Sequence, residues 1–194
     1  GDTCGGYGST CLTCTGVRDA DWAKHECADP LNPSPNTGKA FDISWINQVG
    51  YPVATPCTRN PVTDEVVVQQ GGCVGWVGLG VPQVGPCGQE THCEGNVPAQ
   101  AVYDLFARDL QGFVNGETNY GFNTALEITT RLVAIAADNL ANWYTCSQGA
   151  GGCTTITAYN MFLAADDDDG NLNNGTPHMT AIFNAFNRHG IGCA

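Results

Sequence analysis

The stretch "FNTALEITTRLVAIAADNLANWY", residues 122–144, decides the fold class of this chain. Its apolar side chains recur at intervals of three and four residues, which is typical of one face of an α-helix. The positions that carry the pattern are Leu126, Leu132, Val133, Ile135, Ala136 and Leu140. Because small and apolar residues also fill many of the other positions, we expect a long and largely buried helix.

Two shorter stretches on either side show the same helical spacing. "NVPAQAVYDLFARDL", residues 96–110, has Asn96 at the expected N-cap and Pro98 in the first turn, which are signals of a helix start. Its apolar positions are Val102, Leu105, Phe106 and Leu110. "TTITAYNMFLAAD", residues 154–166, supplies Ile156, Tyr159, Phe162 and Leu163. We therefore predict one helix before the central one and another after it.

A fourth helix is predicted near the C-terminal end. Thr176 is expected as its N-cap, Pro177 as its first helical residue and Gly190 as its stop. Its apolar residues are Ile182, Phe183 and Phe186. With four helices, residues 91–194 are predicted to form a helical subdomain.

Residues 1–90 have a different composition, dense in cysteine, glycine and proline, as in "QGGCVGWVGLGVPQVGPCG". Such a composition indicates loops braced by disulfides, with little regular structure. The predicted fold class is therefore mainly α with a disulfide-rich irregular N-terminal half. A chain of 194 residues fits one ordinary domain, so we expect the two parts to form one folding unit.

The charge balance limits the partners that this chain can bind. Its net charge of −12, from 19 acidic and 7 basic side chains, repels phosphate backbones and anionic membranes. We therefore expect no nucleic-acid partner. The longest apolar run, at residues 132–137, is far shorter than the roughly 20 residues that a membrane span needs.

The cysteine count indicates an oxidising compartment. Eleven cysteines in an acidic, glycine-rich chain are typical of extracellular proteins, so we predict a secreted protein whose leader was removed before Gly1. Because eleven is odd, at least one cysteine is free or bonded to another chain. We expect Cys146 and Cys153, separated by "SQGAGG", to form a disulfide that closes the connection between two helices.

Two short motifs resemble metal sites but lack the residues to complete them. Cys11 and Cys14 form a C-x-x-C, yet no second C-x-x-C follows, so bonding of each cysteine elsewhere is favoured. "HECAD", residues 25–29, begins like the H-E-x-x-H of zinc peptidases, but Asp29 stands in place of the second histidine. For three histidines we expect structural roles: His25 and His92 in cysteine-rich surroundings, and His189 as a residue that compensates the dipole at the C-terminal end of the last helix.

The acidic loop at residues 166–171 is the best candidate for metal binding. Four consecutive aspartates followed by a glycine and an asparagine concentrate hard oxygen ligands around a turn, as calcium loops do. The candidate calcium ligands are Asp167 and Asp169 first, with Asp166, Asp168 and Asn171 behind them. The loop is not an EF-hand, because Thr176 stands where the bidentate glutamate would be. A solvated acidic loop without metal remains the alternative.

His178 is the candidate catalytic residue. It follows Pro177 in the first turn of the last predicted helix, where its ring can point out of the helix start; a plain surface or cap role is the alternative. "NNGTPHMTAIFNAF", residues 173–186, resembles a segment of thermolysin-like and fungalysin-like zinc metallopeptidases that runs Asn-Gly-Gly-Val-His into a helix. The matching residues are Asn174, Gly175, His178, Ile182, Ala185 and Phe186. In that family the histidine donates a hydrogen bond to the oxyanion formed on the scissile carbonyl, so the resemblance implies this role for His178.

A second stretch, "HCEGNVPAQAVYDL" at residues 92–105, is similar to the fungalysin stretch His-x-x-Gly-Glu-Val-Trp-Ala followed by Leu-Tyr-Glu. The similarity runs through His92, Gly95, Val97, Ala99, Val102, Tyr103 and Asp104. The two stretches occur in the family's order and together cover roughly residues 90–191. They imply the C-terminal helical subdomain of a thermolysin-like peptidase, with residues 1–89 as an insertion.

Several departures from the family change what the resemblance implies. Asn96 replaces the family's glutamate, and Asn173 replaces the aspartate that orients the histidine, so the orientation must come from neighbouring aspartates. The H-E-x-x-H helix and the third zinc ligand do not occur in this sequence. We therefore predict the C-terminal part of a secreted zinc metalloendopeptidase, inactive alone. Its zinc would belong to an N-terminal half of the same precursor. The expected partner is that half or an identical copy of the chain, joined through the unpaired cysteine.

Two readings from other classes remain open. One is an extracellular structural subunit, stabilised by disulfides and calcium, whose leftover cysteine links identical copies of the chain. The other is a calcium-dependent binding module with Trp45, Trp76 and Trp143 as contact residues, although core packing is the commoner fate of buried tryptophans.

Overall fold

The computed structural model describes residues 42–47, 58–59, 66–67, 73–74, 84–112, 119–147, 153–154 and 156–193. Within these residues the chain is mainly helical, which confirms the predicted helical C-terminal half. The described strands are β1 (Thr58–Arg59) and β2 (Val66–Val67), which pair antiparallel with Thr58 opposite Val67. In this described part no helix is long and apolar enough to cross a membrane. Most of residues 1–90, with the C-x-x-C and "HECAD" motifs, lies outside the described residues.

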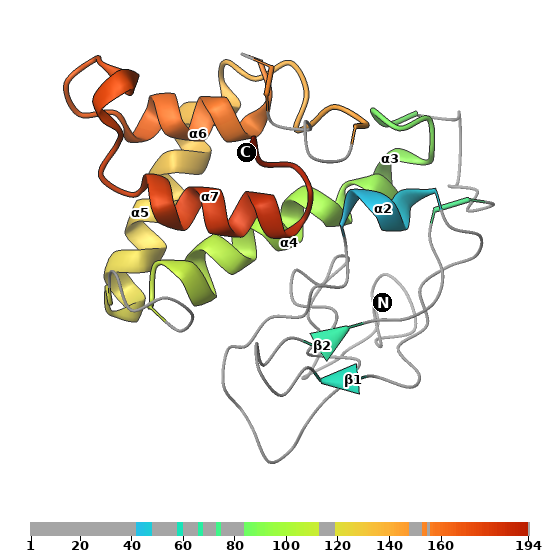
Figure 1. The fold of residues 1–194 in the computed structure, drawn as a ribbon, viewed down its shortest axis with the longest axis horizontal. Helices are drawn as coiled ribbons and strands as arrows, with labels where there is room; N and C mark the ends of the chain where they lie inside the picture. The colour runs from blue at the N-terminus through green and yellow to red at the C-terminus, as the bar shows by residue number, and fades with distance from the viewer. Residues whose placement is uncertain are drawn as a thin grey trace, which may run out of the picture.

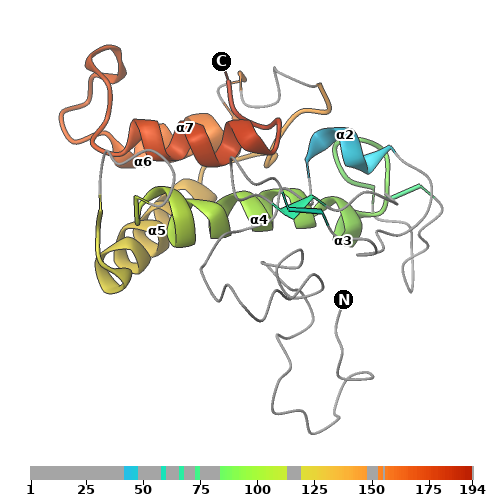
Figure 2. The ribbon, with the colours of Figure 1, turned by 60° about the horizontal axis from the view of Figure 1, so that its bottom comes forward.

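Four longer helices form the body of the described part of the chain, and Figure 1 shows their arrangement. They are α4 (Asn96–Asp104), which continues into the π-helix η1 (Leu105–Asp109), α5 (Phe122–Ala137), α6 (Ala158–Asp166) and α7 (Met179–Arg188). Helix α7 packs on α4, η1 and α6, while α5 packs on η1 and α6. The short helices α2 (Ile43–Ile46) and α3 (Thr91–Glu94) lie at the end away from α5, as Figures 1 and 2 both show.

The prediction that the central helix is largely buried was wrong. Helix α5 buries Ala125, Thr129, Leu132 and Ala136, which form a single face toward η1 and α6. Leu126 and Ile135 lie outside this face and are each 45% exposed. The helix also ends at Ala137, and the chain then runs in an irregular path to the buried Tyr144. Only one side of α5 meets other helices, so its remaining apolar residues stay at the surface.

The ends of α7 show which sequence signals decide a helix boundary. The predicted N-cap Thr176 does not cap the helix; its hydroxyl donates to Asp166 instead, and α7 begins at Met179 after His178. The predicted stop at Gly190 is confirmed. This glycine has a φ of +69°, in the left-handed region, and Ile191 and Gly192 donate their N–H groups back to the carbonyl of Phe186.

The core combines aromatic rings packed at an angle to one another with buried charges. The rings of Phe162 and Phe186 lie 5.0 Å apart between α6 and α7. Arg188 forms an ion pair with Asp104, which joins the end of α7 to the end of α4. His189 is fully buried and lies 3.1 Å from the same carboxylate, through its Nε2. Its position supports the structural role expected for His189.

Three disulfides connect described cysteines, and they correct the predicted pairing. The bonds are Cys73–Cys93, Cys87–Cys146 and Cys153–Cys193. The predicted Cys146–Cys153 bond is absent among them. Each of these two cysteines bonds instead to a cysteine that is distant in sequence and that the packing of the chain brings close. The turn at 84–90 brings Cys87 to Cys146, and the C-terminal segment after α7 brings Cys193 to Cys153. The other five cysteines lie outside the described residues; five is odd, so the prediction of an unpaired cysteine now concerns that set.

A buried carboxylate fixes the turn that carries Cys87. Glu94 is 1% exposed and accepts hydrogen bonds from the N–H groups of Cys87 and Gln89 and from the hydroxyl of Tyr144. Burial, and then the nearby Glu94 carboxylate, raise the pKa of Tyr144 far above its usual value, so its hydroxyl remains a donor. Glu94 therefore links the turn that directly precedes its helix to the segment of Tyr144, which lies 50 residues later in the sequence.

We predict that Gly190→Ala destabilises the protein more than Gly88→Ala. Both glycines have a positive φ, so alanine at either position costs about 1–2 kcal/mol of backbone strain. A Cβ at Gly190 would also lie 2.7 Å from Cγ2 of Ile43, whereas a Cβ at Gly88 meets nothing within 4 Å. Urea unfolding of the two variants measures the difference, and equal losses would contradict the packing of α2 on this turn.

Candidate functional site

The candidate site is built around the carboxylate of Asp166, the last residue of α6. The side chain of Asp166 is buried, with 3% exposure, and its carboxylate accepts three hydrogen bonds. Its Oδ2 accepts from the hydroxyl of Thr176 at 2.7 Å and from the backbone N–H of His178 at 2.6 Å. Its Oδ1 lies 2.6 Å from Nδ1 of His178. One buried carboxylate thus holds the main chain and the side chain of the candidate catalytic histidine.

The acidic loop returns the chain to Asp166. Directly after α6, Oδ1 of Asp167 accepts from the N–H groups of Asp169 and Gly170, both at 3.1 Å, and this closes a tight turn. Gly170 and Gly175 take φ values of +80° and +88°, which the local turns require. Between them lies the short 3₁₀ helix η2 (Leu172–Asn174). The loop therefore brings residues 176–178 back beside the helix from which it leaves.

The geometry defines which edge of His178 is available. A carboxylate only accepts when ionised, so Nδ1 carries the hydrogen that points to Asp166. The side chain is 13% exposed, and the ring of Tyr120 packs on it edge-on, with centroids 5.3 Å apart. No residue that the structure describes makes a hydrogen bond to Nε2. The Nε2 edge is therefore the part of His178 that can meet an external group.

The hydrogen bonds keep Asp166 ionised in its buried position. Burial alone raises the pKa of a carboxyl, but the hydrogen bonds from the His178 side chain, the Thr176 hydroxyl and the His178 backbone together outweigh it. The pKa of Asp166 therefore lies below its usual value. An ionised Asp166 stabilises a positive charge on the imidazole beside it.

The structure separates the five candidate calcium ligands. Asp167, Asp168 and Asp169 each offer an oxygen, and these oxygens lie within 4.8 Å of one another. Asp166 points instead to His178, and Asn171 accepts from the N–H of Asn173 at 3.3 Å. The hydrogen bond from the backbone N–H of Asp169 is the largest effect on the pKa of Asp167 and lowers it. Burial raises this pKa by less, and further hydrogen bonds, from Gly170 among others, also lower it, so the pKa lies below its usual value. Three of the five candidates thus form a compact cluster of oxygens.

Among the described residues, no group of three or more metal-binding side chains other than these three aspartates comes together. The side chains of His92 and Trp45, and all of His25 and Trp76, lie outside the described residues. Trp143 is half-buried, and its ring lies 6.4 Å from that of Phe162. This packing gives Trp143 a place at the edge of the core.

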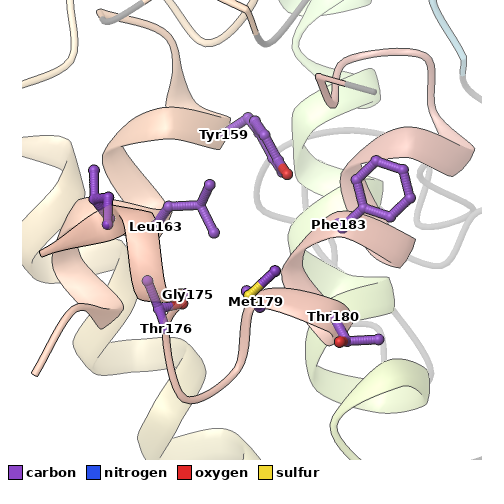
Figure 3. Close-up of a pocket in the computed structure, with 8 residues that line it drawn as sticks. Tyr159, Leu163, Gly175, Thr176, Met179, Thr180 and Phe183 are labelled. Atoms are coloured by element: carbon purple, nitrogen blue, oxygen red, sulfur yellow. The ribbon is translucent and has the colours of Figure 1, made fainter.

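An apolar pocket of about 230 Å³ opens between α6 and α7 (Figure 3). Its walls are Tyr159 and Leu163 from α6, Met179, Thr180 and Phe183 from α7, and Leu172, Gly175 and Thr176 from the loop. Sequence reasoning missed this pocket because most of these residues fit a helix core. The available signal was the pair Leu172 and Met179, two apolar residues in an otherwise polar stretch. In the structure they are 51% and 47% exposed.

Sequence reasoning also missed two residues that contact the Asp166–His178 pair. Thr176 was expected to cap a helix, and its hydroxyl donates to Asp166 instead. Tyr120 was not singled out, because no local pattern shows that it meets a residue 58 positions later. The orientation of His178 by a neighbouring aspartate, in contrast, was expected, and Asp166 provides it.

Comparison with known proteins identifies no relative: no family profile, curated protein or solved structure matches this chain. The resemblance to thermolysin-like peptidases therefore rests on the sequence motifs quoted above.

We predict that Asp166→Asn lowers the free energy of unfolding by about 1–3 kcal/mol at neutral pH, because an amide must turn its NH₂ toward one of three donors. Because the folded pKa of Asp166 is depressed, its contribution exists above the unfolded pKa of about 3.9 and is lost as the pH falls through the folded value. Urea unfolding from neutral to acidic pH tests both effects. Asp168→Asn, at an exposed position, is the control; equal losses in both variants would contradict the role of Asp166.

Proposed function

We propose that this chain is the C-terminal lobe of a secreted zinc metalloendopeptidase, in which His178 donates a hydrogen bond to the tetrahedral oxyanion. The observation that carries the proposal is the hydrogen bond between Nδ1 of His178 and the buried Asp166. This hydrogen bond holds the imidazole in one orientation and leaves its Nε2 edge available to an external group. The motif resemblance at residues 173–186 supports the same role.

The donor requires a protonated imidazole. When both ring nitrogens carry hydrogen, Nδ1–H remains on Asp166 and Nε2–H can donate to an oxygen outside. The negative charge that develops on a carbonyl oxygen during acyl transfer is the group that such a donor stabilises. Asp166 stays ionised in this step, because its three hydrogen bonds favour the charged form.

The described residues offer His178 no zinc ligand set, so in this proposal the ligands and the general base lie elsewhere in the precursor. Zinc bound there would supply the Lewis acid that polarises the carbonyl and the attacking water. The C-terminal lobe would contribute His178 as the oxyanion donor and Asp166 as the residue that orients it. An unpaired cysteine among the five outside the described residues would connect the two parts.

We also propose that residues 167–169 bind calcium. Carboxylate oxygens are the ligands that calcium prefers, and the three side chains offer oxygens within 4.8 Å of one another. The lowered pKa of Asp167 means that this carboxylate is ionised at neutral pH. Bound calcium would stabilise the loop that returns His178 to Asp166.

The second candidate function is an extracellular structural subunit of linked identical copies. The three disulfides among the described residues, together with the odd total of cysteines, favour it. It predicts polymers of one chain without hydrolytic activity. The two proposals therefore differ in the chains that the natively purified protein contains: a second, zinc-binding part for the peptidase, and copies of this chain alone for the structural subunit.

We predict that His178→Ala lowers kcat of the complete peptidase by about 10²–10³-fold, as expected for loss of one oxyanion donor. Intact mass of the natively purified protein, before and after reduction, first identifies every chain present. Thr130→Ala, at an exposed position on α5 away from the site, is the control and should leave kcat unchanged. Unchanged turnover of His178→Ala, or native material made only of this chain, would overturn the peptidase proposal.

We predict that calcium raises the melting temperature and that a chelator reverses the shift. Calcium at a hundredfold excess over its Kd would stabilise the folded chain by about 2.7 kcal/mol. The double variant Asp167→Asn/Asp169→Asn keeps acceptors for the loop's N–H groups but should lose the response. Asp138→Asn, an exposed carboxylate at the end of α5, is the control. An equal calcium response in the double variant would place the calcium effect elsewhere.

A further inference from the structure

We infer that Tyr120 is a positioning residue for His178, and this role rests on the proposed function of His178 as an oxyanion donor. The two rings meet edge-on, with centroids 5.3 Å apart and planes inclined by 61°. Tyr120 is half-buried and belongs to the segment before α5, far from the α6–α7 loop in sequence. The contact therefore joins His178 to a second, independent part of the fold.

Tyr120 is itself held in place by the end of the π-helix. Its backbone N–H donates to the carbonyl of Leu110 at 3.0 Å. Leu110 is fully buried and donates its own N–H to the carbonyl of Leu105, five residues earlier, which is the hydrogen bond of a π-turn. Directly after Tyr120, Gly121 caps α5, which begins at Phe122. The ring therefore extends from a backbone that is fixed at Tyr120 itself and at the helix start that follows it.

One hydrogen bond does not define the orientation of an imidazole. The bond from Nδ1 to Asp166 fixes one ring atom, but the ring can still tilt about that bond, and a tilt swings Nε2 through an arc. The ring of Tyr120 fills one side of His178 and limits this tilt. A donor misplaced by about 1 Å can cost roughly a hundredfold in rate. Tyr120 thus acts through His178, by packing and not by its hydroxyl.

The test compares Tyr120→Leu, which removes the aromatic ring, with Tyr120→Phe, which keeps it. Phe122→Leu is the matched control, since Phe122 lies on the same segment but its ring contacts Phe106 and not His178. NMR of the labelled 194-residue chain at one pH follows the imidazole 1H, 13C and 15N signals of His178. Tyr120→Phe and Phe122→Leu should leave one sharp set at wild-type positions. Tyr120→Leu should shift and broaden it.

In the complete peptidase, Tyr120→Leu should lower kcat by about 10- to 100-fold with KM unchanged, and Tyr120→Phe should retain wild-type kcat. Tyr120→Met replaces Tyr120→Leu if the latter does not fold, which urea unfolding shows. Unchanged His178 signals in the ring-deleted variant would overturn the inference whatever the kinetics. A loss of kcat in Tyr120→Phe would also overturn it, because the hydroxyl would then be the active group. If Tyr120→Leu disturbs His178 but His178→Ala retains full turnover, the positioning holds and the proposed function fails.

Discussion

The buried carboxylate of Asp166 joins the end of α6 to the start of α7, and both the packing of this helix pair and the orientation of His178 depend on it. A charge removed from water costs several kcal/mol unless hydrogen bonds replace the lost hydration. Here the replacements are the Thr176 hydroxyl and two N–H groups of His178. Because all three donors come from residues 176–178, the carboxylate is satisfied only when the acidic loop closes in its observed path. The fold and the candidate site are therefore stabilised by the same contact.

Two other buried carboxylates also connect separate segments of the chain. Glu94 connects the turn at residues 84–90 to the segment that contains Tyr144, and Asp104 connects α4 to Arg188 and His189 at the end of α7. Each of these carboxylates is at most 1% exposed. A chain with a net charge of −12 thus places part of its negative charge inside, where each carboxylate ties segments that are distant in sequence. The helices are short, and these buried carboxylates together with the disulfides fix how they cross.

The sequence predicted the features that local chemistry decides. Helical spacing located the four longer helices, and Gly190 marked the end of α7 because only a residue tolerant of a left-handed backbone fits there. Features that depend on distant partners were not predictable. Leu126 could not be recognised as exposed without knowing which face of α5 meets η1 and α6. Likewise, Cys146 has a nearby candidate in Cys153, and only the packing of the 84–90 turn shows that Cys87 is its partner.

The arrangement of Asp166 and His178 favours a role outside the stability of the chain. Apolar side chains of similar volume often stabilise a protein as well as a buried ionic pair does, so such a pair is weak support for a purely structural purpose. In this chain the pair is placed so that Nδ1 faces inward while the other edge of the imidazole reaches the surface, and Tyr120 packs against the ring. The structural subunit gives this open edge no task, because water alone would hydrate a ring nitrogen at the surface. A histidine held on one side and open on the other fits a donor that awaits an oxygen from a bound substrate, which favours the peptidase proposal over the structural subunit.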